Sequence, residues 1–214
     1  MDAPKFKDVP LVGILRGISA EHMASVVEAL VAAGLGYMEI TMNTPEASGV
    51  IFEAVKASKG RIEVGAGTVL SKSDLEIALT SGAEFIVTPV MVADVVSECV
   101  KNDIPVFPGA FTPKEVFEAW QAGATMVKVF PASMFGPKYF TELKGPFNDI
   151  KLMAVGGVRV ENIAEYFSCG ADAVAFGASV FRKDWISDRD YDSIRHLVAQ
   201  YVQTVKVAVK YHQL

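Results

Sequence analysis

The chain has 214 residues, of which 51% are apolar and 21% are charged, and its 20 Lys+Arg against 25 Asp+Glu give a net charge of −5. This length predicts one domain over residues 1–214. The acidic balance and the lack of a long basic run argue against nucleic acid and against an anionic membrane surface as partners. No apolar stretch reaches the roughly 18 residues of a transmembrane helix. Two cysteines and no signal-peptide pattern predict a cytoplasmic protein.

Short apolar runs alternate with longer amphipathic stretches along the chain. The short runs are bounded mostly by Gly or Pro, which predicts eight strands, at residues 11–15, 37–41, 62–66, 85–88, 105–108, 126–129, 152–155 and 173–176. Helical patterns fill the intervals, for example at residues 21–33, 73–81, 113–121 and 162–168. Eight strand–helix pairs predict a parallel sheet that closes into a single (β/α)8 TIM barrel.

A glycine repeat supports the barrel. Four of the predicted helices end in a small residue followed by glycine, and a strand begins a few residues later. These glycines are Gly34, Gly82, Gly123 and Gly170. Each suits the left-handed backbone position that ends a helix. Their spacing places them two strand–helix pairs apart, before strands two, four, six and eight.

Equivalent positions on alternate strands of such a barrel point inward and share one layer of its interior. The residues five places after the four glycines are Glu39, Val87, Lys128 and Ala175. Strands two and six lie across the barrel from each other. Glu39 and Lys128 should therefore face one another near the carboxyl-terminal rim.

Lys128 lies in the middle of its predicted strand, where a parallel barrel leaves no solvated face. A buried ammonium must find a partner or lose its proton. A desolvated lysine with a lowered pKa is a nucleophile that forms Schiff bases with carbonyls, and a carboxyl at Glu39 would move protons beside it. The alternatives are an edge-strand or snorkelling lysine, and a structural ion pair of Glu39 with Lys128 or Arg16.

Further candidates follow the predicted carboxyl ends of other strands. Arg16 suits a bidentate pair with a carboxylate, or is a plain surface arginine. Thr68 ends a small-residue run that leaves space for a ligand and matches a dinucleotide fingerprint poorly. The loops at 155–158 and 177–179 offer glycine amides where many barrels bind phosphate, although Gly156-Gly157 alone also suits a tight turn. The last helix carries an apolar stripe, including Tyr201, that needs only a packing role.

Several motifs together resemble those of the class I 2-keto-3-deoxy-6-phosphogluconate / 4-hydroxy-2-oxoglutarate aldolases, from about residue 11 to residue 181. They are Glu39-Ile40-Thr41, the Val-Gly-Ala-Gly-Thr-Val run at 64–69, Val87-Thr88-Pro89, Pro108-Gly109, Val127-Lys128-Val129-Phe130-Pro131, Gly136-Pro137, Val155-Gly156-Gly157 and Gly177-Ala178-Ser179. The runs at 14–17, 43–45 and 154–157 look more like the 6-phosphogalactonate aldolases. Many phosphogluconate-type members have an arginine at the position of Asn43, and a threonine at that of Val155.

The resemblance implies a role for each matching residue. Lys128 would form the Schiff base, and Glu39 would be the general acid/base. The substrate contacts would be Arg16 and Thr68 on the carboxylate, Pro89 and Phe130 on the pocket wall, and Gly156, Gly157, Gly177 and Ser179 at the phosphate. Such enzymes are typically homotrimers that need no cofactor and no metal.

The resemblance predicts a carbon–carbon lyase of carbohydrate metabolism, of the Entner–Doudoroff type. It would reversibly cleave a 2-keto-3-deoxy-6-phospho sugar acid, a small anionic substrate, to pyruvate and glyceraldehyde 3-phosphate. Cleavage of 4-hydroxy-2-oxoglutarate to pyruvate and glyoxylate is a further candidate reaction. The rivals are a metal-dependent aldolase, for which a ligand cluster is lacking, a phosphate-binding isomerase or epimerase, and a non-catalytic phospho-sugar-binding barrel.

Overall fold

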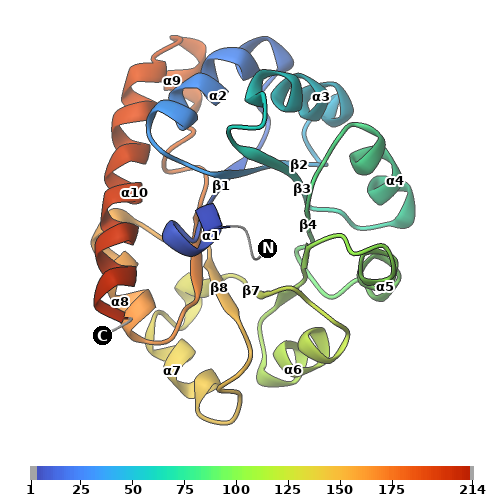
Figure 1. Ribbon diagram of the computed structural model, residues 1–214, viewed down its shortest axis with the longest axis vertical. Helices are drawn as coiled ribbons and strands as arrows, with labels where there is room; N and C mark the ends of the chain where they lie inside the picture. Colours follow the sequence, from blue (N-terminus) through green and yellow to red (C-terminus); the bar gives the residue numbers. More distant parts are fainter. Residues whose placement is uncertain (1–3, 213–214) are drawn as a thin grey trace.

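The computed structural model describes residues 4–212, which form a barrel of parallel strands ringed by helices (Figure 1). The strands are short and almost fully buried, and they are β1 (Leu11–Leu15), β2 (Tyr37–Thr41), β3 (Glu63–Gly67), β4 (Ile86–Val87), β5 (Val106–Phe107), β6 (Gly109–Ala110), β7 (Val127–Val129), β8 (Leu152–Val155) and β9 (Ala173–Phe176). The predicted TIM-type barrel is confirmed.

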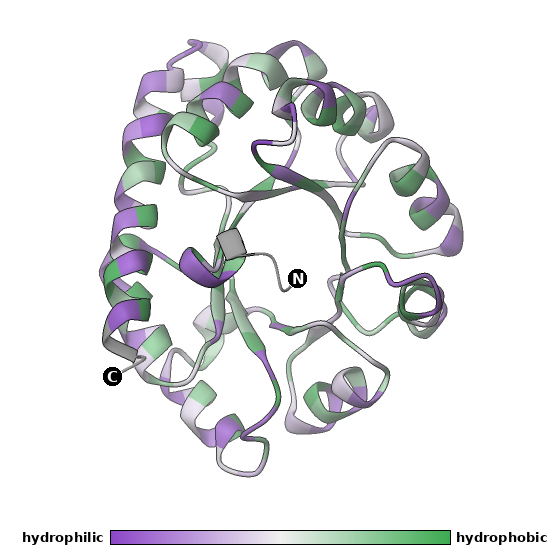
Figure 2. Cartoon of the chain, viewed as in Figure 1, coloured by the Kyte–Doolittle hydropathy of each residue, from purple (hydrophilic) through white to green (hydrophobic). Residues whose placement is uncertain are grey.

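The helices pack around the outside of the strands. They are α1 (Pro4–Asp8), α2 (Met23–Ala32), α3 (Ala47–Ser58), α4 (Lys72–Thr80), α5 (Ala93–Lys101), α6 (Pro113–Gln121), α7 (Lys138–Lys144), α8 (Ile163–Ser168), α9 (Lys183–Ser187) and α10 (Tyr191–His212), with 3-10 turns η1 (Ala20–His22), η2 (Ala132–Met134) and η3 (Val160–Asn162). Their hydrophobic sides turn toward the strands (Figure 2). Among the helices of residues 4–212, none combines the length and apolar character needed to cross a bilayer.

The sheet runs in the order β5-β4-β3-β2-β1-β9-β8-β7-β6, and each neighbouring pair is parallel. The described residues thus form nine strands rather than the predicted eight, because the chain continues past Pro108, where the fifth predicted run ends, into a separate short strand, β6. Proline has no N–H for the ladder, so β5 pairs with β4 while β6 pairs with β7. The N–H of Lys128 donates to the carbonyl of Pro108 at 2.9 Å. The two ends of the sheet therefore meet in one segment, and the barrel closes.

The glycine repeat has the predicted geometry. The four glycines have left-handed backbones, with φ of +84° at Gly34, +96° at Gly82, +94° at Gly123 and +100° at Gly170. Three residues after each of them, a side chain enters one apolar cluster inside the barrel, and these are Tyr37, Phe85, Met126 and Ala173. Five residues after, Val87 and Ala175 join the same cluster, while Glu39 and Lys128 are its buried charged neighbours.

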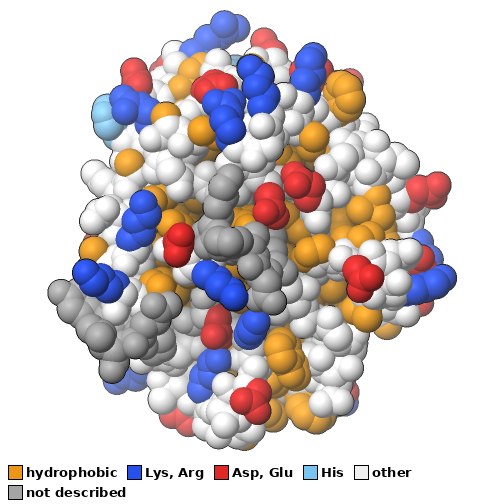
Figure 3. All heavy atoms as spheres, viewed as in Figure 1, with side chains coloured by type: hydrophobic (Ala, Val, Ile, Leu, Met, Phe, Trp, Pro, Cys, Tyr) orange, Lys and Arg blue, Asp and Glu red, His pale blue; other side chains and the backbone are white. Residues whose placement is uncertain are grey.

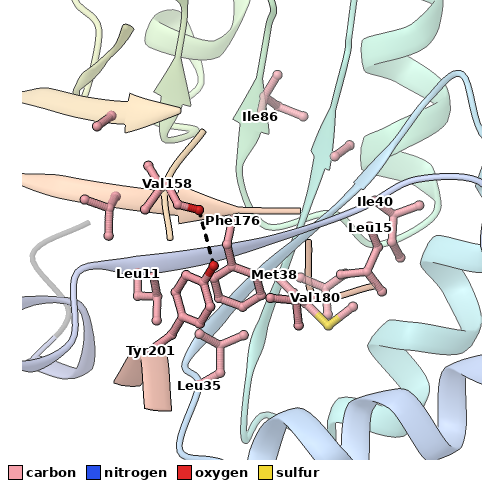
Figure 4. Close-up of a cluster of buried hydrophobic side chains, with 14 of the residues drawn as sticks. Leu11, Leu15, Leu35, Met38, Ile40, Ile86, Val158, Phe176, Val180 and Tyr201 are labelled. Carbon is pink, nitrogen blue, oxygen red and sulfur yellow. Dashed lines mark hydrogen bonds between the residues drawn. The ribbon is translucent and has the colours of Figure 1, made fainter. Parts of the chain in front are cut away.

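The outward-facing strand side chains belong to a second, larger core beneath the helices. Figure 4 shows part of it, where Tyr201 of α10 reaches the barrel wall. The Tyr201 ring lies 4.7 Å from the ring of Phe176, centroid to centroid, and its hydroxyl donates to the carbonyl of Val158 at 3.2 Å. Tyr201 therefore does more than fill an apolar stripe, because its polar end bonds to the chain just after β8.

The amino-terminal end of the barrel is covered by α1, which Figure 1 shows within the ring of strands. The Phe6 ring packs edge-on against Tyr37, with 4.8 Å between centroids, and is 4% exposed. The Tyr37 hydroxyl donates to Glu63 at 3.0 Å. On the face of the molecule seen in Figure 3, acidic and basic side chains are interspersed.

Candidate active site

Lys128 projects from the middle of β7 into the barrel and is 6% exposed. Its neighbours Val127 and Val129 point the other way, into the core beneath the helices. Burial lowers the pKa of the Lys128 amine; the charge of Glu39 opposes this shift, and the positive charge of Arg16 adds to it. The Lys128 Nζ lies 5.3 Å from the centroid of the Phe130 ring. A lowered pKa increases the share of the amine that is neutral and able to act as a nucleophile.

Glu39 projects inward from β2 and is 2% exposed. Burial raises the pKa of its carboxyl, while the charges of Lys128 and Arg16 pull the pKa back down. On the neighbouring strand, Gly67 makes the room for this carboxyl, since a Cβ at that position would collide with Glu39 Oε1. The small residues of this run were expected to leave space for a ligand, and at Gly67 they leave it for Glu39.

The predicted rim residues lie where their strands end. Arg16 follows β1 directly and is exposed, and its charge acts on both Glu39 and Lys128. Thr68 follows β3 with φ +54°, a backbone conformation that β-branched residues rarely adopt and that is typically retained at functional sites. Pro89 lies two residues beyond β4, and its carbonyl leaves no room for a side chain at Gly109, the register partner of Lys128.

The two glycine loops lie beyond β8 and β9. Gly156 and Gly157 have φ of +95° and +77°. Within residues 4–212, the backbone amides of Gly156, Gly157 and Ser179 donate to no protein acceptor. The Tyr201 hydroxyl, which bonds to the carbonyl of Val158, also lies 3.4 Å from Ser179 Oγ. One buried tyrosine therefore joins the two loops that carry these unbonded amides.

Three further residues lie around the predicted ones. The sequence did not single out Thr41 and Thr44, which form a buried hydroxyl pair where the strand that carries Glu39 ends; the inward alternation of β2 was a signal for Thr41. Ser133, from η2, packs so closely on Gly157 that a Cβ on the glycine would lie 2.5 Å from that of the serine. In the described part of the chain, His, Cys, Asp and Glu side chains form no group of three or more suited to a metal ion.

A buried amine and a buried carboxyl at the carboxyl-terminal mouth of a (β/α)8 barrel form the arrangement of a lysine-dependent, class I aldolase. Comparison with known proteins agrees. The family model of the KDPG and KHG aldolases matches residues 3–197. The 2-dehydro-3-deoxy-6-phosphogalactonate aldolase of Escherichia coli (strain K12) is 34% identical over 199 residues, which are 92% of this chain and 97% of the relative.

Two more comparisons agree. The 2-dehydro-3-deoxy-phosphogluconate aldolase of Haemophilus influenzae (strain ATCC 51907 / DSM 11121 / KW20 / Rd) is 30% identical over 204 residues, 94% of this chain and 95% of the relative. A solved structure described as native KDPGal superimposes with a TM-score of 0.88 at 33% identity, covering 94% of this chain and 97% of the other. The chain belongs to the KDPG and KHG aldolase family. It is an enzyme, a carbon–carbon lyase.

Proposed function

We propose that this aldolase cleaves a 2-keto-3-deoxy-6-phospho sugar acid to pyruvate and glyceraldehyde 3-phosphate through a Schiff base on Lys128. One observation carries the proposal: an amine whose pKa burial lowers lies inside the barrel with a carboxyl whose pKa burial raises. Each group is shifted toward its neutral form. A neutral amine can attack a ketone, and a protonated carboxyl can donate to the oxygen that leaves.

The steps follow from these two groups. The Lys128 amine adds to the C2 ketone, and the carbinolamine loses water, with Glu39 supplying the proton, to give an iminium. Glu39, now ionised, takes the proton of the C4 hydroxyl while the C3–C4 bond breaks. The bonding electrons pass to the iminium and form an enamine, and glyceraldehyde 3-phosphate leaves. Glu39 then protonates C3, and water hydrolyses the resulting iminium to pyruvate and free Lys128.

The rest of the substrate would be held by the residues around the mouth. We assign the carboxylate to Arg16 and Thr68, because a guanidinium pairs with a carboxylate through two parallel hydrogen bonds. Pro89 and Phe130 would form the wall. The phosphate would lie against Gly156, Gly157, Gly177 and Ser179, supported by amides that have no protein acceptor and by the hydroxyl of Tyr201 behind them.

We assign the galactonate configuration at C4 to the preferred substrate. The phosphogluconate and phosphogalactonate acids differ there and yield the same products. Val155, 4% exposed, lies in the inner cluster of the barrel, where a valine offers no hydrogen bond to a hydroxyl and a threonine would. Asn43 likewise stands uncharged at the rim, where many phosphogluconate-type members have arginine.

Borohydride reduction in the presence of pyruvate, followed by peptide mass analysis, tests the Schiff base. We expect a pyruvyl adduct on Lys128 in the wild type and none in Lys128→Met. Lys138→Met, which alters an exposed lysine at the start of α7, is the matched control and should keep the adduct. Turnover of a sugar phosphate without an adduct would overturn the proposal in favour of an isomerase or epimerase. An active enzyme inhibited by a chelator would overturn it in favour of metal chemistry.

Turnover of the two C4 epimers tests the configuration. We expect kcat/KM for the galactonate epimer to exceed that for the gluconate epimer by about tenfold or more, since one hydrogen bond discriminates on that scale. Val155→Thr should move the ratio toward the gluconate epimer. Unphosphorylated 4-hydroxy-2-oxoglutarate should be cleaved with a higher KM, because it has no phosphate for the glycine loops. A gluconate preference in the wild type would overturn the assignment.

We also propose that the enzyme is a cytoplasmic homotrimer without cofactor or metal, as its family resemblance implies. Met134 and Phe135 support an assembly, because they are 68% and 59% exposed at the rim of the barrel, and large exposed apolar side chains in a group are typical of interaction sites. Sedimentation of the full chain should give a particle of three copies. A monomer at micromolar concentration would contradict this state.

A further inference from the structure

The chain turns sharply beyond β2, and two threonine hydroxyls fill the turn. Thr41 is fully buried and Thr44 is 5% exposed. Their Oγ1 atoms lie 3.2 Å apart, and the N–H of Thr44 donates to the carbonyl of Thr41 at 2.9 Å. The N–H of Met42 donates to the carbonyl of Gly67 at 2.7 Å, which ties the same turn to β3. These contacts fix the turn, which begins two residues after Glu39.

The hydroxyl of Thr44 has a second partner, in the segment that follows β1. Its Oγ1 accepts a hydrogen bond at 3.0 Å from the backbone N–H of Gly17, 27 residues earlier in the chain. Gly17 has φ +70° and directly follows Arg16. This bond fixes the turn that leaves β1, and it does so one residue after the arginine.

Arg16 depends on that turn for its place. Within residues 4–212 no acidic side chain forms an ion pair with its guanidinium. A long, exposed side chain without a partner samples many rotamers, so its average position is set by its backbone. The charge of Arg16 nevertheless lowers the pKa of both Glu39 and Lys128, so the placement of its backbone bears on the reacting pair.

We propose that Thr44 is a positioning residue, whose hydroxyl holds the Gly17 amide so that Arg16 meets the carboxylate of the 2-oxo acid. This inference rests on the proposed function, because it takes Arg16 as the carboxylate partner. Thr44 itself touches neither substrate nor the reacting atoms. Its contribution is to the free energy of binding rather than to the bond-breaking step.

Thr44→Val removes the hydroxyl and keeps the branched shape, and Thr44→Ser is its matched conservative control. The probe is pyruvate, at the concentration that half-saturates borohydride trapping. We expect Thr44→Val to raise this concentration by up to about tenfold, the equivalent of about 1.4 kcal/mol, because the part-buried N–H of Gly17 loses its acceptor. The kcat for cleavage should change by less than about twofold. Thr44→Ser should lie within about twofold of the wild type in both quantities.

A double-mutant cycle separates this role from general damage. Arg16→Gln alone should weaken pyruvate trapping, and adding Thr44→Val to it should weaken trapping by less than about twofold more. Three outcomes would each overturn the inference. They are a tenfold loss of pyruvate affinity when Thr44→Val is added to Arg16→Gln, unchanged pyruvate affinity in Thr44→Val alone, and a Thr44→Ser variant that binds pyruvate as weakly as Thr44→Val.

Two further controls keep these results interpretable. If thermal melting shows that Thr44→Val is poorly folded, Thr44→Ala, which relieves crowding as well as removing the hydroxyl, takes its place with the same expectations. The wild type is trapped first, and absence of its adduct would count against the Schiff base itself. A wild-type adduct combined with unaltered trapping in Thr44→Val would count against the role of Thr44 alone.

Discussion

The two ends of the barrel are built from the same repeat and differ in what fills them. At the amino-terminal end the repeat supplies Tyr37, Phe85, Met126 and Ala173, and Phe6 of α1 packs beneath them. In the next layer, toward the carboxyl-terminal end, the same repeat supplies two charged side chains, Glu39 and Lys128, beside two apolar ones. The lower layer takes no part in the reaction, but it excludes water from the side of the upper layer that it covers. The lower layer therefore supports the chemistry at the other end by shielding it, without taking part in it.

The largest expected effect on turnover is at the carboxyl of the upper layer. Glu39→Gln keeps the shape and removes the acid/base, so kcat should fall by about 10²–10⁴-fold. The lost negative charge also stops raising the pKa of Lys128, so the amine should remain at least as available for addition. Borohydride trapping of pyruvate on Lys128, with kcat measured in parallel, checks both points. Full activity in Glu39→Gln would contradict the acid/base role, because it would show that Lys128 supports turnover without the carboxyl.

The next effect comes from the space that Gly67 provides. Gly67→Ala would place a methyl group against Glu39 Oε1, and a displacement near 1 Å can cost about 10²-fold, so we expect kcat to fall by about 10–100-fold. Gly49→Ala is the matched control, since a Cβ there, in α3, meets no atom within 4 Å. It should keep full activity and stabilise the fold by roughly 0.5–1 kcal/mol. Equal kinetics in both variants would contradict the crowding.

A smaller effect is expected on the pH dependence. The amine must be unprotonated to attack, so kcat/KM should rise with pH through the pKa of Lys128, which burial holds below its usual value of 10.5. The positive charge of Arg16 lowers this pKa further. Arg16→Gln should therefore raise it and move the acid limb of the profile to higher pH, whereas Arg195→Gln on α10 should not. A limb that moves to lower pH in Arg16→Gln would contradict the sign.

The smallest effect on turnover is expected at the closed end. Phe6→Ala should lower the free energy of unfolding by about 3 kcal/mol, because it removes a nearly buried ring. The kcat at saturating substrate and 25 °C should stay within about twofold of the wild type, since α1 lies a full layer below the amine. Denaturant unfolding and initial rates give the two numbers. A large loss of kcat without loss of stability would show that the ends are coupled more directly.

The glycine repeat made the centre of the site predictable. Left-handed glycines mark the helix ends, so counting five residues onward found Glu39 and Lys128 without any knowledge of tertiary contacts. The split of the fifth strand was not predicted, because Pro108 looked like the boundary of an apolar run rather than its middle. Thr44 was beyond reach for a different reason. Its partner is a backbone N–H in the turn after β1, and no side-chain pattern encodes such a pairing.

The layer that contains Glu39 and Lys128 has two further positions, which hold apolar residues. Val87 and Ala175 are both at most 2% exposed and belong to the cluster that surrounds the reacting pair. A short polar side chain at Ala175 would project from a third strand, β9, into this cluster, with no change to the loops. Position 175 is therefore a place where a redesigned enzyme could carry another functional group, because the backbone of β9 already directs the side chain toward the reacting pair.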